Sequence, residues 1–233
     1  MQKVISVTVP AYNEQNLIAG CLDSLLNQTL DKDKYEIIVI DNNSTDLTAK
    51  IATEKGVRVE KELEKGYVHA IRKGIEVSQA AIIAFTDADC RVPKDWVAKI
   101  LDDFSASPDI IAVGGKLRFY DLNPILDNLI WLILYPMNVL PGNNMAIKRE
   151  GLIRMGGIDP KINLSVDFWL TTKLRRRNVG KIIVDKCLVI ETSGRRFKGS
   201  FSSDLKYFIN VISILVSSKP LFYDFPDVRE GAG

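Results

Sequence analysis

Two aspartates one residue apart follow an apolar stretch in the segment AIIAFTDADC. Asp87 and Asp89 repel each other at this spacing unless a cation lies beside them. Such a pair suits a hard divalent cation that keeps several waters and takes its remaining ligands from substrate phosphates. Asp89 is also suited to an Asx turn before the next helix. The position directly after an apolar strand favours the metal site over the turn.

Two further polar segments follow apolar runs in the first half of the chain. Residues 10–14 come after a run at 3–9, and residues 41–46 begin where a run at 35–41 ends. Ligands of parallel sheets bind at the carboxyl ends of the strands. We therefore expect both segments to meet the aspartate pair at one edge of a sheet.

The elements that position these segments alternate between strands and helices. Apolar β-branched runs predict strands, and apolar residues at helical spacing predict helices. We expect strands at 3–9, 35–41, 57–61, 81–87, 109–120, 143–149, 180–185 and 187–191. We expect helices at 13–28, 44–56, 67–78, 94–106, 123–139, 150–159, 165–178 and 205–218. This alternation predicts an α/β fold in which a mostly parallel, Rossmann-like sheet is covered by helices on both faces.

The composition is that of one folded domain with balanced charge. The 233 residues are 46% hydrophobic, which is enough for one sizeable core, and the net charge of +2 argues against a nucleic-acid partner. Cys21, Cys90 and Cys187 are scattered and lack C-x-x-C spacing. They predict neither a disulfide framework nor a structural zinc site, and they suit a reducing compartment.

The apolar stretches of the sequence are too short to cross a membrane. The stretch at 125–140 contains Asp127 and Pro136, and the stretch at 205–218 ends before Lys219. A spanning helix needs roughly 20 apolar residues. The first residues lack a long apolar region, so we expect no signal peptide and a cytoplasmic location.

Several motifs, in order, resemble the family 2 glycosyltransferases, which have the GT-A fold. The segments VTVPAYNEQNLIAGCLDSLLNQ and EIIVIDNNSTDLTAKIA are similar to the first two strands of that family and their loops. The segments KGYVHAIRKGI, IIAFTDADCRVPKDW and GNNMAIKREGLIRMGGID are similar to its later motifs, including D-x-D. The likeness covers residues 3–200. It implies a metal-dependent inverting transferase, a single GT-A domain over 1–233, that moves a sugar from a nucleotide-diphosphate sugar to an acceptor hydroxyl.

The resemblance implies a donor site in residues 1–120, with a UDP-sugar favoured over a GDP-sugar. Asp41 would accept a hydrogen bond from the base, because a carboxylate pairs with a ring N–H. Arg72 matches a basic residue of the family, although ordinary packing or solvated charge is the alternative for Arg72 and Tyr12. The donor contacts implied in this half are Pro10, Ala11, Tyr12, Glu14, Asp41, Asn43, Arg72, Asp87 and Ala88.

The resemblance also implies the metal ligands. Asp89 would bind Mn²⁺ or Mg²⁺ directly, and Asp87 would lie near the ribose and a metal-bound water. His69 is the only histidine of the chain. It lies far upstream of the place where some relatives have a metal-binding histidine, so we expect an incidental role for it.

Asp167 is the candidate catalytic base. Direct displacement with inversion needs a base within hydrogen-bond reach of the acceptor hydroxyl. The family has this base as the aspartate of a Glu-Asp pair that opens a helix, but here Val166 replaces the glutamate, and Trp169 stands where many members have another acid. The alternative role of Asp167, stabilising the helix N-terminus, is compatible with the first. Asp159 is expected to be a turn or cap residue.

Residues 121–233 are expected to receive the acceptor, a saccharide or a polyprenyl-linked saccharide. Arg195 and Arg196 follow the last predicted strand, and the resemblance implies that they contact the leaving diphosphate, which guanidinium groups suit. A solvated basic loop is the alternative for both arginines. The aromatic and apolar residues that suit either an acceptor wall or core packing are Trp131, Tyr135, Met137, Phe168 and Trp169.

The apolar helix expected at 205–218 has three interpretations. It suits an interfacial helix on anionic lipid at the inner face of the cell membrane, because basic residues precede it. It equally suits a homodimer interface or a helix docked on its own core.

Two functions other than transfer stay open. A catalytically silent scaffold that binds sugar nucleotides would explain Val166. A sugar-phosphate nucleotidyltransferase shares the sheet architecture, but the segment PAYNEQN is not the Gly-rich basic loop that such an enzyme needs after its first strand.

Overall fold

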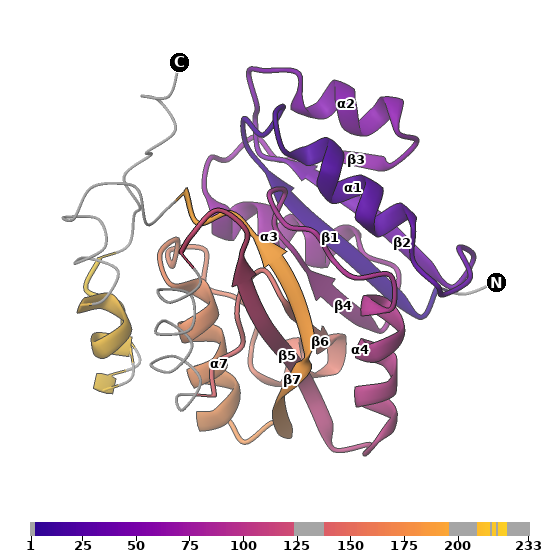
Figure 1. Ribbon diagram of the computed structural model, residues 1–233. Helices are drawn as coiled ribbons and strands as arrows, with labels where there is room; N and C mark the ends of the chain where they lie inside the picture. Colours follow the sequence, from indigo (N-terminus) through magenta and orange to yellow (C-terminus); the bar gives the residue numbers. More distant parts are fainter. Residues whose placement is uncertain (1–2, 124–137, 196–208, 215, 218, 223–233) are drawn as a thin grey trace.

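A seven-stranded mixed sheet forms the centre of the computed structural model (Figure 1). The strand order across the sheet is β3-β2-β1-β4-β6-β5-β7. The structure describes residues 3–123, 138–195, 209–214, 216–217 and 219–222. The predicted α/β class with a mostly parallel sheet is confirmed.

The first four strands are parallel and are connected by helices. The elements of this half are β1 (Ile5–Ala11), α1 (Ile18–Leu26), β2 (Tyr35–Asp41), α2 (Thr48–Glu54), β3 (Arg58–Lys61), α3 (Tyr67–Val77) and β4 (Ile82–Phe85). The register of β1 and β2 places Ala11 opposite Asp41. The polar residues that follow these strands therefore begin at the same level of the sheet.

The second half of the chain completes the sheet. Its elements are α4 (Trp96–Ser105), β5 (Ile110–Phe119), β6 (Met145–Lys148), α6 (Arg149–Arg154), α7 (Val166–Arg176) and β7 (Lys181–Thr192). Strand β6 is antiparallel to β4 and β5, whereas β5 and β7 are parallel. The sheet is therefore mixed in this half.

The two strands expected at 180–185 and 187–191 are one strand, β7. Its pairing with β5 shifts register between Gly114 and Lys116, where the extra residues of β7 form a bulge. A Cβ added at Gly115 would lie 2.0 Å from the carbonyl oxygen of Leu188, so the bulge needs a glycine there. The alternation of the sequence does not reveal a bulge that a facing glycine permits.

Helices α1 and α2 begin four to five residues later than predicted. Asn13, expected as a helix cap, has a φ of 52°. Its side-chain oxygen accepts the Thr45 N–H at 2.9 Å, and its own N–H donates to the Ser44 hydroxyl at 3.1 Å. The residues predicted as caps instead join the β1–α1 and β2–α2 loops to each other.

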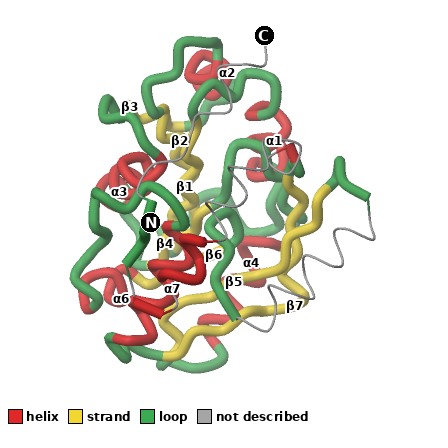
Figure 2. Tube along the Cα trace, turned by 90° about the vertical axis from the view of Figure 1, so that its left-hand side faces the viewer, coloured by secondary structure: helices red, strands yellow, loops and turns green. Residues whose placement is uncertain are grey.

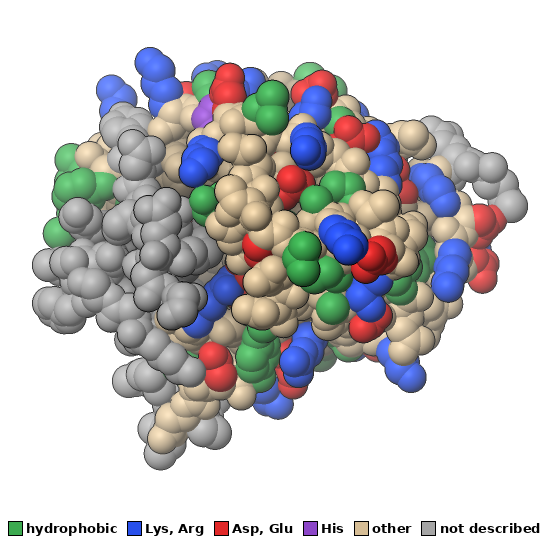
Figure 3. Space-filling view, turned by 90° about the horizontal axis from the view of Figure 1, so that it is seen from above, with side chains coloured by type: hydrophobic (Ala, Val, Ile, Leu, Met, Phe, Trp, Pro, Cys, Tyr) green, Lys and Arg blue, Asp and Glu red, His purple; other side chains and the backbone are tan. Residues whose placement is uncertain are grey.

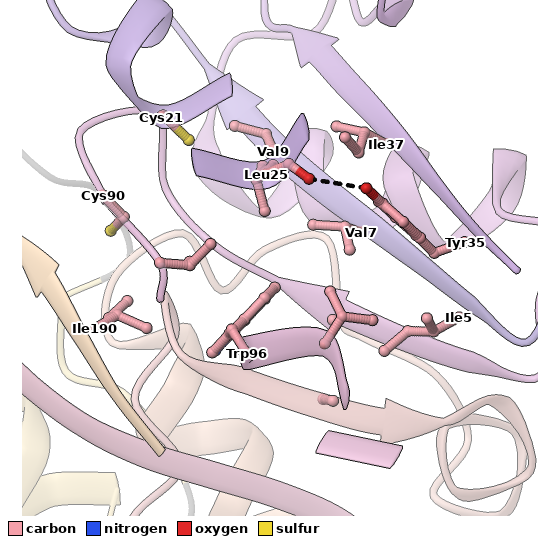
Figure 4. Close-up of a cluster of buried hydrophobic side chains, with 14 of the residues drawn as sticks. Ile5, Val7, Val9, Cys21, Leu25, Tyr35, Ile37, Cys90, Trp96 and Ile190 are labelled. Carbon is pink, nitrogen blue, oxygen red and sulfur yellow. Dashed lines mark hydrogen bonds between the residues drawn. The ribbon is translucent and has the colours of Figure 1, made fainter. Parts of the chain in front are cut away.

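Two hydrophobic clusters lie on opposite faces of the sheet. Figure 2 shows α1 and α4 on one side of the strands and α3, α6 and α7 on the other. The first cluster is built around Trp96, whose indole N–H donates to the Asn144 side chain at 2.9 Å. In the same cluster the Tyr35 hydroxyl donates to the Leu25 carbonyl at 3.1 Å (Figure 4). Phe168 and Trp169 are buried in the second cluster, so their core interpretation is confirmed.

The end of the described chain docks on the second cluster. Residues 209–214 and 216–217 are helical, and Val211 and Ile214 are buried there, while Ile212 and Val216 are exposed. Docking on its own core is therefore observed for one side of the helix expected at 205–218. Among the described residues, no helix combines the length and the apolar character needed to cross a membrane.

Candidate active site

The three polar loops predicted to meet do lie at one edge of the sheet. The Glu14 N–H donates to the Thr48 hydroxyl at 2.7 Å, which ties the loop after β1 to α2. The Cys21 thiol of α1 donates to the Asp87 carbonyl at 3.4 Å, which ties the loop after β4 to the same group. Seen from above, acidic and basic side chains are interspersed on this face of the molecule (Figure 3).

Asp41 ends β2 and is 2% exposed. One of its carboxylate oxygens accepts the Ser44 N–H at 3.2 Å. This bond fixes the carboxylate at the carboxyl end of the strand, where the resemblance assigns it to the base of a nucleotide. The neighbouring Asn43 is exposed and has a φ of 65°.

Asn42 organises the next loop, a role that the sequence did not reveal. Its amide nitrogen donates to the carbonyls of Glu62 and Glu64, at 3.3 and 2.7 Å. Its amide oxygen accepts the Gly66 N–H at 2.8 Å. The side chain thereby holds the start of α3, and hence Tyr67, at the site.

The two aspartates after β4 have different partners. The Tyr67 hydroxyl donates to Asp87 at 3.2 Å. Asp89, whose side chain is 12% exposed, accepts the Thr192 hydroxyl at 3.4 Å and pairs with the Arg195 guanidinium at 3.1 Å. The end of β7 thus reaches the aspartate pair.

Arg195 joins the first loop of the fold to this pair. Its guanidinium donates two hydrogen bonds to Glu14, one of them at 2.9 Å. Burial alone would lower the pKa of Arg195, but the hydrogen bond to Glu14 and the charge of Asp89 outweigh it and raise that pKa. Arg195 therefore stays cationic between two carboxylates.

Two buried thiols lie below the aspartate loop. Burial raises the pKa of Cys21 and of Cys90, and the charges of Asp87 and Asp89 raise both further. A raised pKa favours the neutral thiol, whereas the carboxylates of Asp87 and Asp89 supply hard oxygen atoms.

Asp167 lies in the first turn of α7, where its carboxylate accepts the Phe168 N–H at 3.0 Å. A Cβ added at Gly142 would lie 3.4 Å from both the Asp167 Cβ and the Tyr67 hydroxyl. Gly142 is thus the neighbour of both side chains, and Tyr67 contacts Asp87. The structure therefore brings Asp167 to the edge that holds the D-x-D aspartates.

The remaining predicted residues differ in their surroundings. Pro10, Ala11 and Ala88 are buried, and Arg72 is exposed on α3. The Tyr12 hydroxyl accepts a hydrogen bond from Lys65 at 3.3 Å. The predicted residues that lie outside the described ranges are Trp131, Tyr135, Met137 and Arg196.

The polar contacts of His69 and Asp159 lie away from the aspartate pair. His69 lies 2.9 Å from Glu64, a surface residue of the preceding loop. The Asp159 carboxylate accepts the Lys161 N–H at 3.0 Å, as in a turn. Neither side chain is joined to the aspartate pair by these contacts.

The carboxylates of Asp87 and Asp89 could serve together as ligands of one divalent cation. Within the described ranges, no three side chains from His, Cys, Asp and Glu converge as a ready metal cage. Asp89 already holds a cationic group, the Arg195 guanidinium, and its ligand atoms are hard oxygens. Such oxygens would suit a hard divalent cation that takes its other ligands from water and substrate phosphates.

A surface cavity of about 560 Å³ lies at the opposite edge of the sheet. It is lined by residues around the start of β7 and by Glu150 and Arg154 of α6, which pair with each other. None of the predicted site residues lines it. The chemistry of the strand ends, rather than this hollow, identifies the candidate site.

The fold is that of a GT-A type α/β protein. A family model described as Glycosyl transferase family 2 matches residues 6–152. This match covers more than half of the chain, and the chain belongs to that family.

Curated relatives match parts of the chain. Glycosyltransferase AglE of Haloferax volcanii is 36% identical over 122 residues, 49% of this chain and 40% of that protein. The poly(ribitol-phosphate) beta-glucosyltransferase of Bacillus spizizenii is 39% identical over 140 residues, 53% of this chain and 22% of that protein. The chain is thus matched over less than half the length of either relative.

Solved structures are similar over nearly the whole chain. The mannosyltransferase PcManGT from Pyrobaculum calidifontis, in complex with GDP-Man and Mn²⁺, has a TM-score of 0.76 at 23% identity over 93% of this chain and 65% of that chain. Glucosyl-3-phosphoglycerate synthase from Mycobacterium tuberculosis, in complex with Mn²⁺, UDP and phosphoglyceric acid, has a TM-score of 0.66 at 21% identity, over 97% and 80%. At these identities the likeness shows the fold.

Proposed function

We propose that this chain is an inverting glycosyltransferase that moves a sugar from a nucleotide-diphosphate sugar to an acceptor hydroxyl. The observation that carries the proposal is the convergence of Asp41, the Asp87–Asp89 pair and Asp167 on one edge of the sheet. These carboxylates come from separate elements, and each suits a different part of the reaction.

In this proposal the residues at the carboxyl ends of β1, β2 and β4 bind the sugar donor. Asp41 accepts an N–H from the base, and the loop after β1 lines the nucleotide. Asp89 would hold Mn²⁺ or Mg²⁺ with Asp87 beside it, and the cation would supply positive charge for the leaving diphosphate. The guanidinium of Arg195 adds a second positive charge next to Asp89.

The acceptor hydroxyl is activated at the start of α7. Asp167 takes the proton of the acceptor hydroxyl while the acceptor oxygen bonds to the anomeric carbon. The bond between that carbon and the diphosphate oxygen breaks, and the electron pair leaves with the nucleotide diphosphate. Attack from the side opposite the diphosphate inverts the anomeric centre.

The donor and acceptor classes extend the proposal. We favour a UDP-sugar as donor and a saccharide, free or polyprenyl-linked, as acceptor. The similar structures contain nucleotides of both kinds together with Mn²⁺. PcManGT is in complex with GDP-Man, and glucosyl-3-phosphoglycerate synthase is in complex with UDP. A test therefore has to include both bases.

The test is release of free nucleotide diphosphate from a panel of UDP- and GDP-sugars with Mn²⁺ or Mg²⁺. We expect release with at least one donor and its loss in the folded Asp89→Ala variant. Donor binding without release under every acceptor tried would instead support the scaffold interpretation, which the absence of a glutamate at Val166 favours.

A further inference from the structure

The Arg195 guanidinium lies against the carboxylate that we assign to the metal. Its Nη2 atom is 3.1 Å from Asp89 Oδ2, and the same guanidinium forms a two-bond pair with Glu14. Glu14 and Asp89 are 5% and 12% exposed, whereas the arginine side chain is 41% exposed. The arginine side chain is therefore the most exposed of the three.

Glu14, Asp89 and Arg195 follow three different strands of the sheet. Glu14 follows β1, Asp89 follows β4 and Arg195 follows β7, so a single guanidinium joins three strand ends. The Thr192 hydroxyl also donates to Asp89 at 3.4 Å, and Asn143 donates to that hydroxyl at 3.3 Å. Asp89 is thus held in place by neutral groups as well as by the arginine.

We propose that Arg195 and the divalent cation compete for Asp89, and that Glu14 is the positioning residue that keeps the guanidinium at the site after the cation binds. This inference rests on the proposed function, which supplies the reason for a cation at Asp89. Glu14 was expected to line the nucleotide, and its contacts with Arg195 support this additional role.

Competition follows from charge and from the number of ligands. A cation that binds two carboxylates and water has weak affinity until phosphate oxygens complete its shell. A guanidinium that already neutralises Asp89 lowers that affinity further, because the ion pair must break first. The two bonds to Glu14 give the arginine a partner when it releases Asp89. It then stays within reach of the diphosphate.

Removing Arg195 and removing the Glu14 charge should have opposite effects on the affinity of the site for the metal. Without the arginine, Asp89 is available, so the cation should bind more tightly. Without the Glu14 charge, the arginine pairs more strongly with Asp89, so the cation should bind more weakly. Because the second effect acts through the first, removing the Glu14 charge should have no effect once the arginine is gone.

The experiment is a titration of the full chain with Mn²⁺ in the absence of donor, with bound metal measured by electron paramagnetic resonance. We expect Arg195→Gln to tighten Mn²⁺ binding about five- to tenfold and Glu14→Gln to weaken it about threefold. Changes of this size correspond to the coupling energies of charged residues in contact. The double variant should match Arg195→Gln. Arg195→Lys keeps the positive charge but lacks the planar guanidinium. Its Mn²⁺ affinity should lie between those of the wild type and Arg195→Gln.

Arg91 provides the matched control. It is exposed two residues after Asp89 and stacks on the Tyr120 ring at 4.9 Å. Arg91→Gln removes one positive charge close to the site and should leave the Mn²⁺ affinity within about twofold of the wild type.

Three outcomes would overturn the proposal. Equal Mn²⁺ affinity in the wild type and Arg195→Gln would show that the guanidinium is no competitor. A Glu14→Gln effect that persists in the double variant would show a direct effect of its charge. An Arg91→Gln effect as large as that of Arg195→Gln would show a general effect of charge. Metal binding is read without turnover, so absence of sugar transfer would overturn the proposed function and leave this result standing.

Discussion

At the scale of single residues, Asp167 has surroundings that suit both a helix and a reaction. Its carboxylate accepts an N–H in the first turn of α7, where the helix dipole favours negative charge. Gly142, next to it, has no side chain to fill the space toward the Tyr67 hydroxyl. The carboxylate therefore lies where a helix N-terminus favours negative charge, next to Gly142 and close to Tyr67, which contacts Asp87.

Asp167→Asn tests the assignment of the base. We expect kcat to fall about 10²- to 10⁴-fold, the usual contribution of general base catalysis, with the KM for the donor unchanged. Acceptor-dependent release of nucleotide diphosphate measures both constants. Asp159→Asn, in a turn with Lys161, is the matched control and should keep the wild-type rate. A normal kcat in Asp167→Asn would place the base elsewhere.

The predictable residues are those whose sequence neighbours define their position. Asp41, Asp87 and Asp89 directly follow apolar strands, and in a parallel sheet such residues meet. The pair of Glu14 and Arg195 was not predictable, because 181 residues separate the two side chains along the chain. Contacts of that separation depend on the closed fold, which local sequence patterns do not encode.

At the scale of elements, Asn42 connects β2 to the loop that begins α3. Three hydrogen bonds from one side chain, 6% exposed, hold this loop. Asn42→Ala leaves three partly buried backbone groups of this loop without these partners. We expect a loss of about 2–3 kcal/mol in the free energy of unfolding and weaker donor binding, because Tyr67 shifts from Asp87.

Urea unfolding and donor titration measure the two effects of Asn42→Ala. The exposed Asn16, in the preceding β1–α1 loop, gives the control Asn16→Ala, which should change neither. Full stability in Asn42→Ala would mean that the loop is held by other contacts.

Helix α4 carries a carboxyl group that opposes folding at neutral pH. Burial raises the pKa of Asp103 to about 6, and the charges of Asp185 and Asp102 add to the rise. One of its carboxylate oxygens is buried and has no hydrogen-bond partner within the described residues. The folded state therefore binds the proton more tightly than the unfolded state, and stability falls as pH rises from about 4 to about 6.

Asp103→Asn removes this penalty. We expect it to raise the free energy of unfolding by about 1 kcal/mol at pH 7, a value reduced for partial exposure, and to have little effect at pH 4. Thermal unfolding across this pH range gives the difference. Asp102→Asn, at the exposed neighbouring position, should give a much smaller gain. A pH-independent effect of Asp103→Asn would contradict the raised pKa.

Element types were more predictable than element ends. The apolar runs of β1, β2 and β4 identify buried strands because both faces of the sheet are covered. The starts of α1 and α2 were wrong because Asn13 and Ser44 bond to each other's loop instead of capping helices. A polar residue before a helix has both options, and tertiary contacts decide between them.

At the scale of the whole molecule, one side of the C-terminal segment stays available after docking. Val211 and Ile214 are buried against the second cluster, whereas Ile212 and Val216 are 47% and 77% exposed. The Arg176 guanidinium donates to the Val216 carbonyl at 3.2 Å, so the basic end of α7 lies beside these apolar side chains. Apolar side chains next to basic ones are typical of a surface that rests on anionic lipid.

We expect the full chain to float with vesicles that contain anionic lipid and to stay unbound with neutral vesicles, because the apolar and basic groups act together. Ile212→Ser combined with Val216→Ser should abolish flotation without a loss of stability, since both side chains are exposed. The matched control is Ile153→Ser on α6, where a 71% exposed isoleucine lies outside this segment. Flotation that survives the double substitution would contradict a membrane role for the segment. Sedimentation of the same variant tests the homodimer interpretation, which predicts a dimer in the wild type and a monomer after the double substitution.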